Sequence, residues 1–335
     1  MKIQFIIPCH NEKSNIKKLY ECLLQSVDKL KYDFEFVFID DGSDDDSCQA
    51  MLDIQSLRIP ISIIKLSRNY GKESALKAGI DFVDADAAII LDADMQHPVD
   101  LIPAMIREWK NGSIVVDGIK INRGKETYLN KLCSNLFYKV FSFITGFEFR
   151  GASDFKLIDR KAIDLLKNID EVNRFYRGLT NWIGFKHSKV AFVVEERVNG
   201  KSKWSFVKLF HLAIDALTSF SSKPLQMVTI MGSFTLIFSI ILGMYSLYQR
   251  FFGYTVSGFT TVILVIILIA SIIMISLGII GIYIGKIYNE VKRRPNYVVD
   301  TIYIDKKKID RDYGREEKDL LITHAPFLQN KKNSI

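Results

Sequence analysis

Short apolar runs alternate with amphipathic stretches through roughly the first third of the chain. Runs rich in Ile, Val and Phe predict five strands, at residues 3–8, 34–40, 61–66, 87–92 and 113–119. Apolar residues at helical spacing between these runs predict helices at about 16–24, 46–57, 73–83 and 99–110. Strands that alternate with helices predict an α/β fold, with a mostly parallel sheet covered by helices on both faces.

Two longer apolar runs, 225–248 and 261–284, contain no charged residue. Each has about 24 residues, which is long enough to cross a bilayer as a helix. The link between them contains only Arg250 as a charge, whereas Lys and Arg residues flank the outer ends. The positive-inside rule then predicts a membrane hairpin with both flanks in the cytoplasm. The expected location is therefore the cell (inner or plasma) membrane, with a multi-pass topology and a cytoplasmic N-terminal domain.

The segments 128–144 and 205–220 carry apolar residues at helical spacing with lysines between them. Either helix could pack on the core or lie in the membrane interface, and the second has the better claim to the interface because it leads directly into a span. Small residues in the second span (Gly278, Gly281 and Gly285) would allow helices to approach closely. A homo-oligomer is therefore a possible assembly.

Composition narrows the set of partners. The chain has 335 residues, a formal net charge of +7 and 48% hydrophobic residues, and the charge favours anionic partners. Because the basic residues flank the apolar runs, a membrane is a better expected partner than nucleic acid. The four cysteines form no CxxC pair, which favours reduced thiols in a cytosolic domain. The apolar N-terminal segment is too short for a signal peptide.

These features predict five regions. They are a cytoplasmic domain at 1–202, an amphipathic juxtamembrane helix at 203–222, membrane helices at 225–248 and 261–284, and a charged cytoplasmic tail at 286–335.

Polar clusters follow three of the predicted strands, with the sequences PCHNE, DDGSDDD and DADMQHP. Ligands of open α/β sheets bind beyond the carboxyl ends of the strands. Asp92 and Asp94 would repel each other there unless a cation lay between them, and a hard divalent ion, Mg²⁺ or Mn²⁺, binds such carboxylates together with substrate phosphates. Gln96 and His97 are next in line as ligands, although a structural role suits His97 equally well.

Asp40 and Asp41 follow the second strand and could accept hydrogen bonds from a base or a ribose. The same residues also suit a turn through Gly42 with a helix cap from Ser43 or Asp44. Pro8 and Glu12 lie beside the same rim. Lys72, near a predicted helix N-terminus, could meet a phosphate or could be an ordinary exposed lysine.

The ordered motifs PCHNE, DDGSDD, SRNYGKE, LDADMQHP, ASDFKLIDR, NRFYRG and RVNGKSKWS, followed by two spans, resemble the GT-A fold, family 2 polyprenyl-phosphate glycosyltransferases. Dolichol-phosphate mannose synthase and the bactoprenol glucosyltransferases belong to this group. The bactoprenol branch is more similar, because it shares the C-terminal hairpin. The resemblance covers residues 1 to about 300 and implies a Rossmann-like GT-A domain.

The resemblance also implies site residues. Asp92 and Asp94 would bracket the metal and the nucleotide diphosphate, while Arg197 and Lys203 match a basic pair near the phosphates. The full set expected to bind the nucleotide sugar is Pro8, His10, Glu12, Ile39, Asp40, Asp41, Lys72, Asp92, Ala93, Asp94, Gln96, Arg197 and Lys203. The expected metal ligands are Asp92, Asp94 and Gln96.

Two positions depart from the family pattern. Lys120 stands where Arg is frequent in the family, and a lysine cannot bind a phosphate through two parallel hydrogen bonds as an arginine can. Binding of the lipid phosphate would therefore depend more on Arg123, with Lys203 nearby. Ser153 replaces a frequent Gly but leaves Asp154 in place.

A phosphate acceptor is already anionic and needs no strong base. Asp154 would therefore orient a sugar hydroxyl or a basic side chain, with a structural salt bridge as the alternative, and Asp94, Asp154 and Arg197 are the expected catalytic residues.

The expected reaction is an inverting transfer of a hexose, with glucose from UDP-glucose as the leading donor, onto undecaprenyl (polyprenyl) phosphate. The product would be a lipid-linked sugar for modification of a cell-envelope glycan. Mannose, galactose, N-acetylglucosamine or a modified arabinose stay open as the sugar. A processive polysaccharide synthase fits less well, because NRFYRGLTNW is not a QxxRW motif and two spans form no pore. A non-catalytic membrane scaffold would not need the DxD motif.

Overall fold

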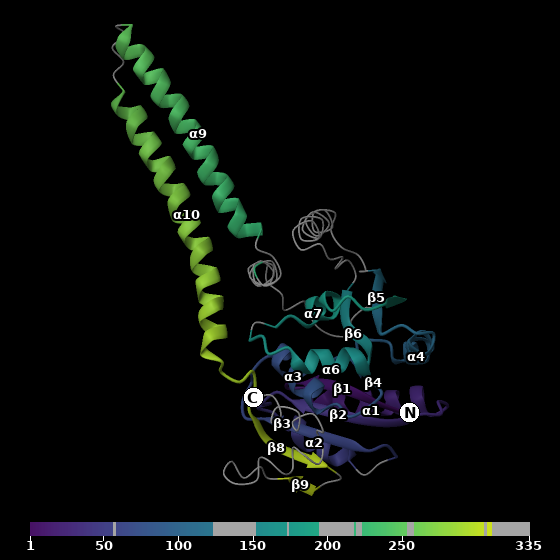
Figure 1. The fold of residues 1–335 in the computed structure, drawn as a ribbon. Coiled ribbons are helices and arrows are strands. Elements are labelled where there is room, and N and C mark those ends of the chain that lie inside the picture. The colour runs from purple at the N-terminus through teal and green to yellow at the C-terminus, as the bar shows by residue number, and fades with distance from the viewer. Residues whose placement is uncertain are drawn as a thin grey trace, which may run out of the picture. The chain divides into compact units, whose positions relative to one another are not determined.

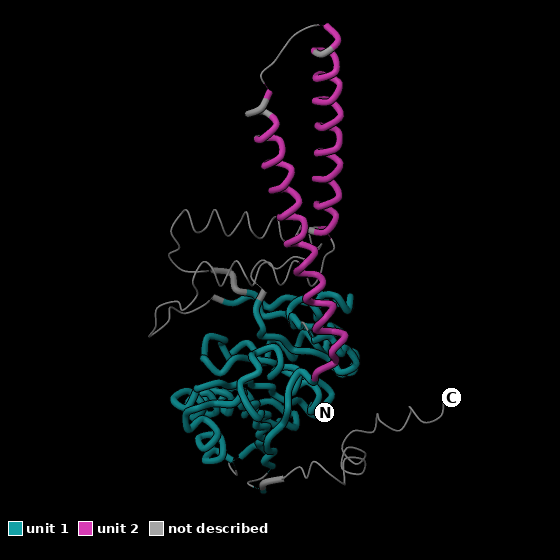
Figure 2. The backbone as a smooth tube through the Cα atoms, turned by 90° about the vertical axis from the view of Figure 1, so that its left-hand side faces the viewer, with its two compact units in different colours: residues 1–132, 149–201, 295–335 teal, residues 133–148, 202–294 magenta. Residues whose placement is uncertain are grey.

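The computed structural model of the protein describes residues 1–55, 58–122, 152–172, 174–193, 218, 223–252, 258–304 and 307–309. The chain divides into two compact units, which Figure 2 shows in different colours. One unit comprises residues 1–132, 149–201 and 295–335 and contains a β-sheet. The other comprises residues 133–148 and 202–294 and contains two long helices (Figure 1).

Among the described residues of the first unit, nine strands form one sheet in the order β7-β5-β6-β4-β1-β2-β3-β8-β9. The strands are β1 (Lys2–Cys9), β2 (Asp33–Asp40), β3 (Ile61–Leu66), β4 (Ala87–Ile90), β5 (Val115–Asn122), β6 (Ala152–Asp159), β7 (His187–Val193), β8 (Val299–Ile304) and β9 (Lys307–Ile309). The helices of this unit are α1 (Lys13–Val27), α2 (Ser47–Ile54), α3 (Lys72–Phe82), η1 (Val99–Leu101), α4 (Ile102–Lys110), α6 (Arg160–Asn168) and α7 (Tyr176–Trp182).

The α/β prediction is confirmed, and every predicted strand and helix of the N-terminal region is present. The sheet is mixed rather than mostly parallel. Strands β4, β1, β2 and β3 run parallel, but β6 lies antiparallel between β4 and β5, and β8 and β9 are antiparallel at the other edge. The region between the predicted helices at 128–144 and 205–220, for which the sequence predicted no strand, supplies strands β6 and β7. Because the four central strands are parallel, their carboxyl ends lie at one edge of the sheet, where the polar clusters follow.

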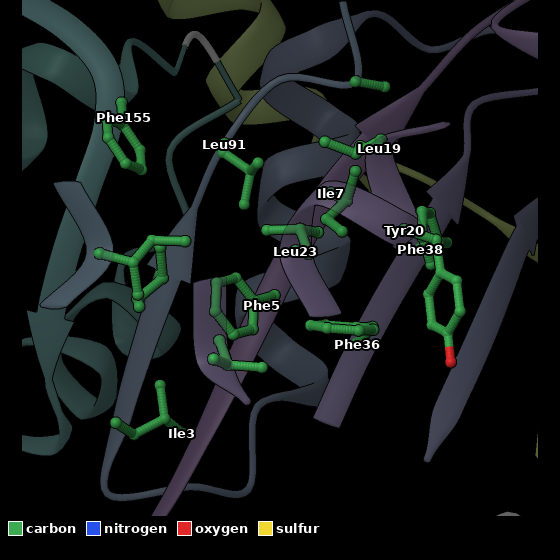
Figure 3. Close-up of a cluster of buried hydrophobic side chains, with 14 of the residues drawn as sticks. Ile3, Phe5, Ile7, Leu19, Tyr20, Leu23, Phe36, Phe38, Leu91 and Phe155 are labelled. Carbon is green, nitrogen blue, oxygen red and sulfur yellow. The ribbon is translucent and has the colours of Figure 1, made fainter. Parts of the chain in front are cut away.

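The core lies on both faces of these central strands. Phe5, Phe36 and Tyr20 pack edge to face, with ring centroids 5.1 Å apart for Phe5–Phe36 and 5.7 Å apart for Tyr20–Phe36 (Figure 3). Leu19 and Leu23 of α1 lie against the same face. Burial on both faces explains why β1 has a nearly continuous apolar sequence instead of an alternating one.

Helix α3 covers the opposite face and approaches the sheet closely. A Cβ atom at Gly79 would collide with the side chains of Ile6 and Ile39. Glycine therefore lets α3 lie directly on β1 and β2, which places the N-terminus of α3 beside the carboxyl ends of these strands.

The chain returns to the sheet after the second long helix. Strand β8 pairs antiparallel with β3, with Ile64 opposite Ile302, and the Ser67 N–H donates to the Val298 carbonyl at 3.0 Å. The charged tail expected from residue 286 therefore includes a strand of the main sheet. Its signal is the VDTIYI sequence, in which Val299 and Ile302 are buried. Pairing with β8 also covers an edge of β3 that would otherwise expose free backbone groups.

The second unit contains α9 (Lys223–Phe251) and α10 (Phe259–Lys292). Both helices are long and apolar enough to cross a membrane, over Leu225–Gln249 and Val265–Lys292, and their apolar side chains are mostly exposed. The two predicted apolar helices are thus present. Their topology and orientation stay predictions, as do the domain boundaries and the homo-oligomer. The amphipathic helices expected at 128–144 and 205–220 lie outside the described residues, apart from Thr218.

The burial of β8 predicts that this strand contributes to stability. Replacing Ile302 by Ala, at a position with 8% exposure, should lower the free energy of unfolding by about 2–4 kcal/mol. Replacing Ile304 by Ala in the same strand, at 43% exposure, should change it by no more than about 0.5 kcal/mol. Denaturant unfolding of the detergent-solubilised chain, followed by tryptophan fluorescence, measures both values. Equal effects for the two variants would contradict the docking of β8.

Candidate functional site

A hollow of about 310 Å³ lies at the carboxyl ends of β1, β2 and β4, beside the N-terminus of α3. It brings together eight of the residues expected to bind the nucleotide sugar: Pro8, His10, Glu12, Asp41, Lys72, Asp92, Ala93 and Asp94. Cys9, Asn69, Gly71 and Ala75 complete its lining. Their ligand-binding roles stay predictions, but the expected convergence of three separate motifs is a property of the fold.

The other expected residues are placed differently. Ile39 and Asp40 are fully buried, Gln96 is half-buried, and none of the three lines the hollow. Arg123, Arg197 and Lys203 lie outside the described residues. Lys120 belongs to β5, but its side chain is likewise outside the described part of the structure.

His10 joins two loops of the site. Its Nδ1 lies 2.9 Å from the carbonyl oxygen of Asp41, which can only accept, so Nδ1 carries a proton. Its Nε2 then accepts from the Asn69 amide at 3.0 Å. Asn11, which follows it, has a positive φ of 57° and turns the chain away from the end of β1. The imidazole is therefore fixed in one tautomer and one orientation at the rim of the hollow.

Asp41 anchors the loop between β3 and α3. Its two carboxylate oxygens accept the backbone N–H groups of Tyr70 at 2.8 Å and Gly71 at 2.9 Å. The side chain is 3% exposed, and the Gly71 N–H is shared with Asn69 Oδ1 at 2.9 Å. Holding this loop, which leads directly into Lys72, is a role that the sequence did not reveal.

The turn after β2 also forms, with a different cap from the one expected. Gly42 has a positive φ of 59°, and Asp40 Oδ1 accepts the Ser43 N–H at 3.0 Å. The expected cap from Ser43 or Asp44 is wrong, because α2 begins only at Ser47 and its N-cap residue is Asp46, whose side chain makes no cap hydrogen bond; the Ser47 N–H donates instead to Asp45 Oδ1 at 2.9 Å. Asp40 is thus used inside the turn, which argues against a direct contact with a ligand.

The DxD segment leaves β4 as a shaped loop. Met95, with a positive φ of 58°, reverses the chain, and the Gln96 N–H donates to Asp94 Oδ1 at 3.1 Å. His97 Nδ1 accepts the Asp92 N–H at 3.3 Å, and its ring stacks on Phe155 with centroids 5.2 Å apart. The structural alternative for His97 is therefore the one that the geometry favours. Asp92 and Asp94 remain on the hollow side, where Asp94 is exposed.

Asp154, on β6, lies at the centre of a chain of ion pairs. Arg177 of α7 donates to it twice, from Nε to Oδ1 at 2.7 Å and from Nη2 to Oδ2 at 2.9 Å. Lys72 Nζ lies 2.6 Å from Asp154 Oδ2 and 2.6 Å from Asp92 Oδ1. Burial alone would raise the pKa of Asp154, but Arg177 and Lys72 hold it well below its usual range. Asp154 is thus a poor proton acceptor, and it orients two basic side chains.

Arg177 and Glu73 are two further residues of this network that sequence reasoning did not assign. The signal for Arg177 was the NRFYRG motif, which supported only the family resemblance. Glu73 accepts the backbone N–H of Tyr176 at 2.7 Å and so fixes the first turn of α7, where Arg177 follows. Burial, with a contribution from the Asp154 charge, raises the pKa of Glu73 to about 7.

The rim of the hollow carries a negative field. Burial raises the pKa of Glu12, and the charges of Asp94, Asp45 and Asp92 raise it further. Such a field attracts cations. No group of three acidic, histidine or cysteine side chains in the described residues is arranged to hold a metal on its own. A divalent ion here would depend on ligand phosphates and water for its remaining bonds.

The raised pKa of Glu73 predicts a pH-dependent stability. The folded state holds the Glu73 proton up to about pH 7, whereas the unfolded chain releases it near 4.5, so stability should fall as pH rises through this interval. Replacing Glu73 by Gln should remove that part of the fall. The midpoint of thermal unfolding of the solubilised chain between pH 5 and 8 measures it. Glu21→Gln, on the exposed side of α1, should leave the pH dependence as in the wild type, and parallel curves for Glu73→Gln would refute the assignment.

Comparison with known proteins places this site in a family. The family model described as glycosyl transferase family 2 matches residues 4–166. An uncharacterized glycosyltransferase of Bacillus subtilis (strain 168) is 35% identical over 315 residues, which covers 93% of this chain and 98% of that protein. The SfII prophage-derived bactoprenol glucosyl transferase of Shigella flexneri is 33% identical over 302 residues, which covers 89% and 97%.

Among solved structures, glucosyl-3-phosphoglycerate synthase from Mycobacterium tuberculosis, in complex with Mn²⁺, uridine diphosphate and phosphoglyceric acid, is similar with a TM-score of 0.45. The sequence identity is 17%, and the match covers 65% of this chain and 76% of that one.

The family model spans the strands and helices that build the hollow, and the relatives match this chain over nearly their whole length. The chain therefore belongs to glycosyl transferase family 2 and is a glycosyltransferase with a GT-A fold.

Proposed function

We propose that this glycosyltransferase moves a hexose, with glucose from UDP-glucose as the first candidate, onto undecaprenyl (polyprenyl) phosphate, with inversion at the sugar carbon. The reaction would take place at the cytoplasmic face of the membrane and would use Mg²⁺ or Mn²⁺. The product would be a lipid-linked sugar for modification of a cell-envelope glycan. The observation that carries the proposal is the charge arrangement of the hollow, where Asp92, Asp94 and Lys72 share the lining and Lys72 joins Asp92 to Asp154, the partner of Arg177.

The residues present fit a divalent ion. Asp92 and Asp94 both line the hollow, and the Lys72 ammonium against Asp92 indicates that this carboxylate is positioned to accept a cation. Gln96 is close in sequence and could add an amide oxygen. A bound ion would neutralise the charge that develops on the diphosphate leaving group.

The chain's own residues would act by position and charge. The acceptor phosphate is already an anion, so the main demand is to hold two anions together and to stabilise the leaving group. Asp154 supports this by fixing Arg177 and Lys72, both of which stay positively charged: burial alone would lower the pKa of each, but their carboxylate partners raise it. In this proposal Lys120, Arg123 and Lys203 bind the lipid phosphate, and Arg197 binds the donor.

The lipid acceptor is supported by two independent observations. The relative from Shigella flexneri is named a bactoprenol glucosyl transferase, and bactoprenol is a polyprenyl lipid carrier. Helices α9 and α10 are apolar and long enough to cross a bilayer, as an enzyme acting on such a lipid would require. A cytoplasmic orientation follows from the basic flanks of these helices.

The direct test is a donor screen. Membranes containing the full chain are incubated with undecaprenyl phosphate, a divalent ion and each of several labelled nucleotide sugars, and the lipid extract is analysed. UDP-glucose should give a lipid-linked product that chelation of the metal abolishes. A lipid-linked product formed only from another nucleotide sugar would replace glucose by that sugar in the proposal. The absence of a product with every donor would refute the proposed reaction.

Removing one carboxylate of the acidic pair should reduce transfer strongly. Asp94→Asn should lower the turnover by at least about 100-fold, which is the typical loss on removing one group that stabilises transition-state charge. Membrane insertion should be unchanged. Asp53→Asn, on the exposed side of α2, is the control and should keep wild-type transfer. Transfer by Asp94→Asn within tenfold of wild type would contradict the metal assignment.

A further inference from the structure

The ammonium group of Lys72 contacts the Asp92 carboxylate, which the proposed metal would also need as a ligand. Its Nζ lies 2.6 Å from Asp92 Oδ1 and 2.8 Å from Asp92 Oδ2, so the ammonium faces both oxygens of the group. A divalent ion bound to Asp92 would lie within about 2.0–2.6 Å of one of these oxygens. Two cations at such a separation repel each other, and Lys72 cannot keep both contacts while a metal binds there.

The structure also allows Lys72 to leave. Its side chain is 41% exposed and has four rotatable carbon–carbon bonds, and it begins α3 directly after Gly71, so its stem is not packed in the core. Departure would not leave Asp154 without a partner, because the two hydrogen bonds from Arg177 would remain. The buried carboxylate of Asp154 thus stays compensated when the half-buried carboxylate of Asp92 changes its partner.

A bound diphosphate would give the freed ammonium a second anion to contact. Lys72 lies at the N-terminus of an α-helix of 11 residues, where the backbone N–H groups and the helix dipole favour a phosphate. Lys72, Asp92 and Asp94 all line the same hollow. A nucleoside diphosphate bound beside the metal would therefore offer the ammonium a replacement partner within reach of its stem.

We propose that Lys72 is a tethered counter-ion that holds Asp92 until the metal arrives with a nucleoside diphosphate, and that then moves to the diphosphate. This inference rests on the proposed metal site. It makes the two ligands mutually dependent, because the metal alone must displace Lys72, whereas the diphosphate removes the competitor. The free enzyme would then bind metal weakly, and it would bind the metal together with the diphosphate far more tightly.

A purely structural ion pair would behave differently. If Lys72 only maintained the local fold, its removal would leave the acidic loop less ordered and metal binding unchanged or weaker. If Lys72 competes with the metal, its removal must strengthen metal binding in the absence of nucleotide. The sign of the change in metal affinity therefore separates the two roles.

The experiment is a Mn²⁺ titration of the full chain in detergent, with free Mn²⁺ followed by electron paramagnetic resonance. Without nucleotide, Lys72→Met should bind Mn²⁺ about tenfold more tightly than wild type, which corresponds to roughly 1.4 kcal/mol. Lys72→Arg, which keeps the charge and can form a bidentate pair with Asp92, should bind no more tightly than wild type.

Lys13→Met is the matched control. Lys13 is also the first residue of a helix and also forms an ion pair at 2.6 Å, with Asp46, but it does not line the hollow. Its replacement removes the same unit of charge and should change the Mn²⁺ affinity by no more than about twofold.

A second arm adds UDP. Lys72→Met should bind UDP in the presence of Mn²⁺ several-fold more weakly than wild type, so the enhancement of Mn²⁺ binding by UDP should shrink. Equal or weaker Mn²⁺ binding by Lys72→Met would overturn the inference and leave the metal site standing. Mn²⁺ binding that is absent from the wild type even when UDP is present, or that survives in Asp92→Asn, would instead overturn the proposed metal site and the inference with it.

Discussion

The buried negative charge of Asp154 is the constraint around which the site is organised. A carboxylate with 5% exposure is costly unless it is paired, and here Arg177 and Lys72 compensate it. These partners come from α7 and α3, so one charge joins three separate elements. Because Lys72 also contacts Asp92, the same network sets the electrostatics of the acidic pair. The arrangement favours catalysis by charge and position over catalysis by a general base.

Hydrogen bonds between loops hold the site together at the carboxyl ends of the central strands, beyond the apolar core. Asp41 holds the β3–α3 loop through two backbone N–H groups, and His10 bridges that loop to the end of β2. At the start of the same loop, the Ser67 N–H donates to the Val298 carbonyl, in the segment that follows α10. Strand β8 then pairs with β3, so the sheet carrying the site includes residues from both sides of the apolar hairpin in the sequence. In the sequence, α9 and α10 therefore lie between strands of the same sheet and do not follow its last strand.

The family assignment and the site geometry agree on the chemistry but differ in what they explain. Membership of glycosyl transferase family 2 identifies the class of reaction. The geometry explains why a carboxylate such as Asp154 can lie at the centre of the site without accepting a proton. The pKa of that group is held low by its basic partners, whereas burial raises the pKa of neighbouring Glu73 to about 7. Two nearby carboxyl groups thus lose their protons in widely separated pH ranges.

The sequence by itself determined the features that depend on local pattern. The strands and helices of the N-terminal region, the two apolar helices and the position of Asp92 and Asp94 follow from periodicity, from charge-free length and from acidic residues after an apolar run. The tertiary structure decided the pairings. Lys72 and Asp154 are 82 residues apart, and β8 pairs with a strand more than 230 residues before it. No local pattern encodes such partners, because many arginines, lysines and β-branched segments of the chain could have filled these places. The choice among them was made by the mixed order of the sheet, which brings β6 beside β4 and leaves β3 free to accept β8.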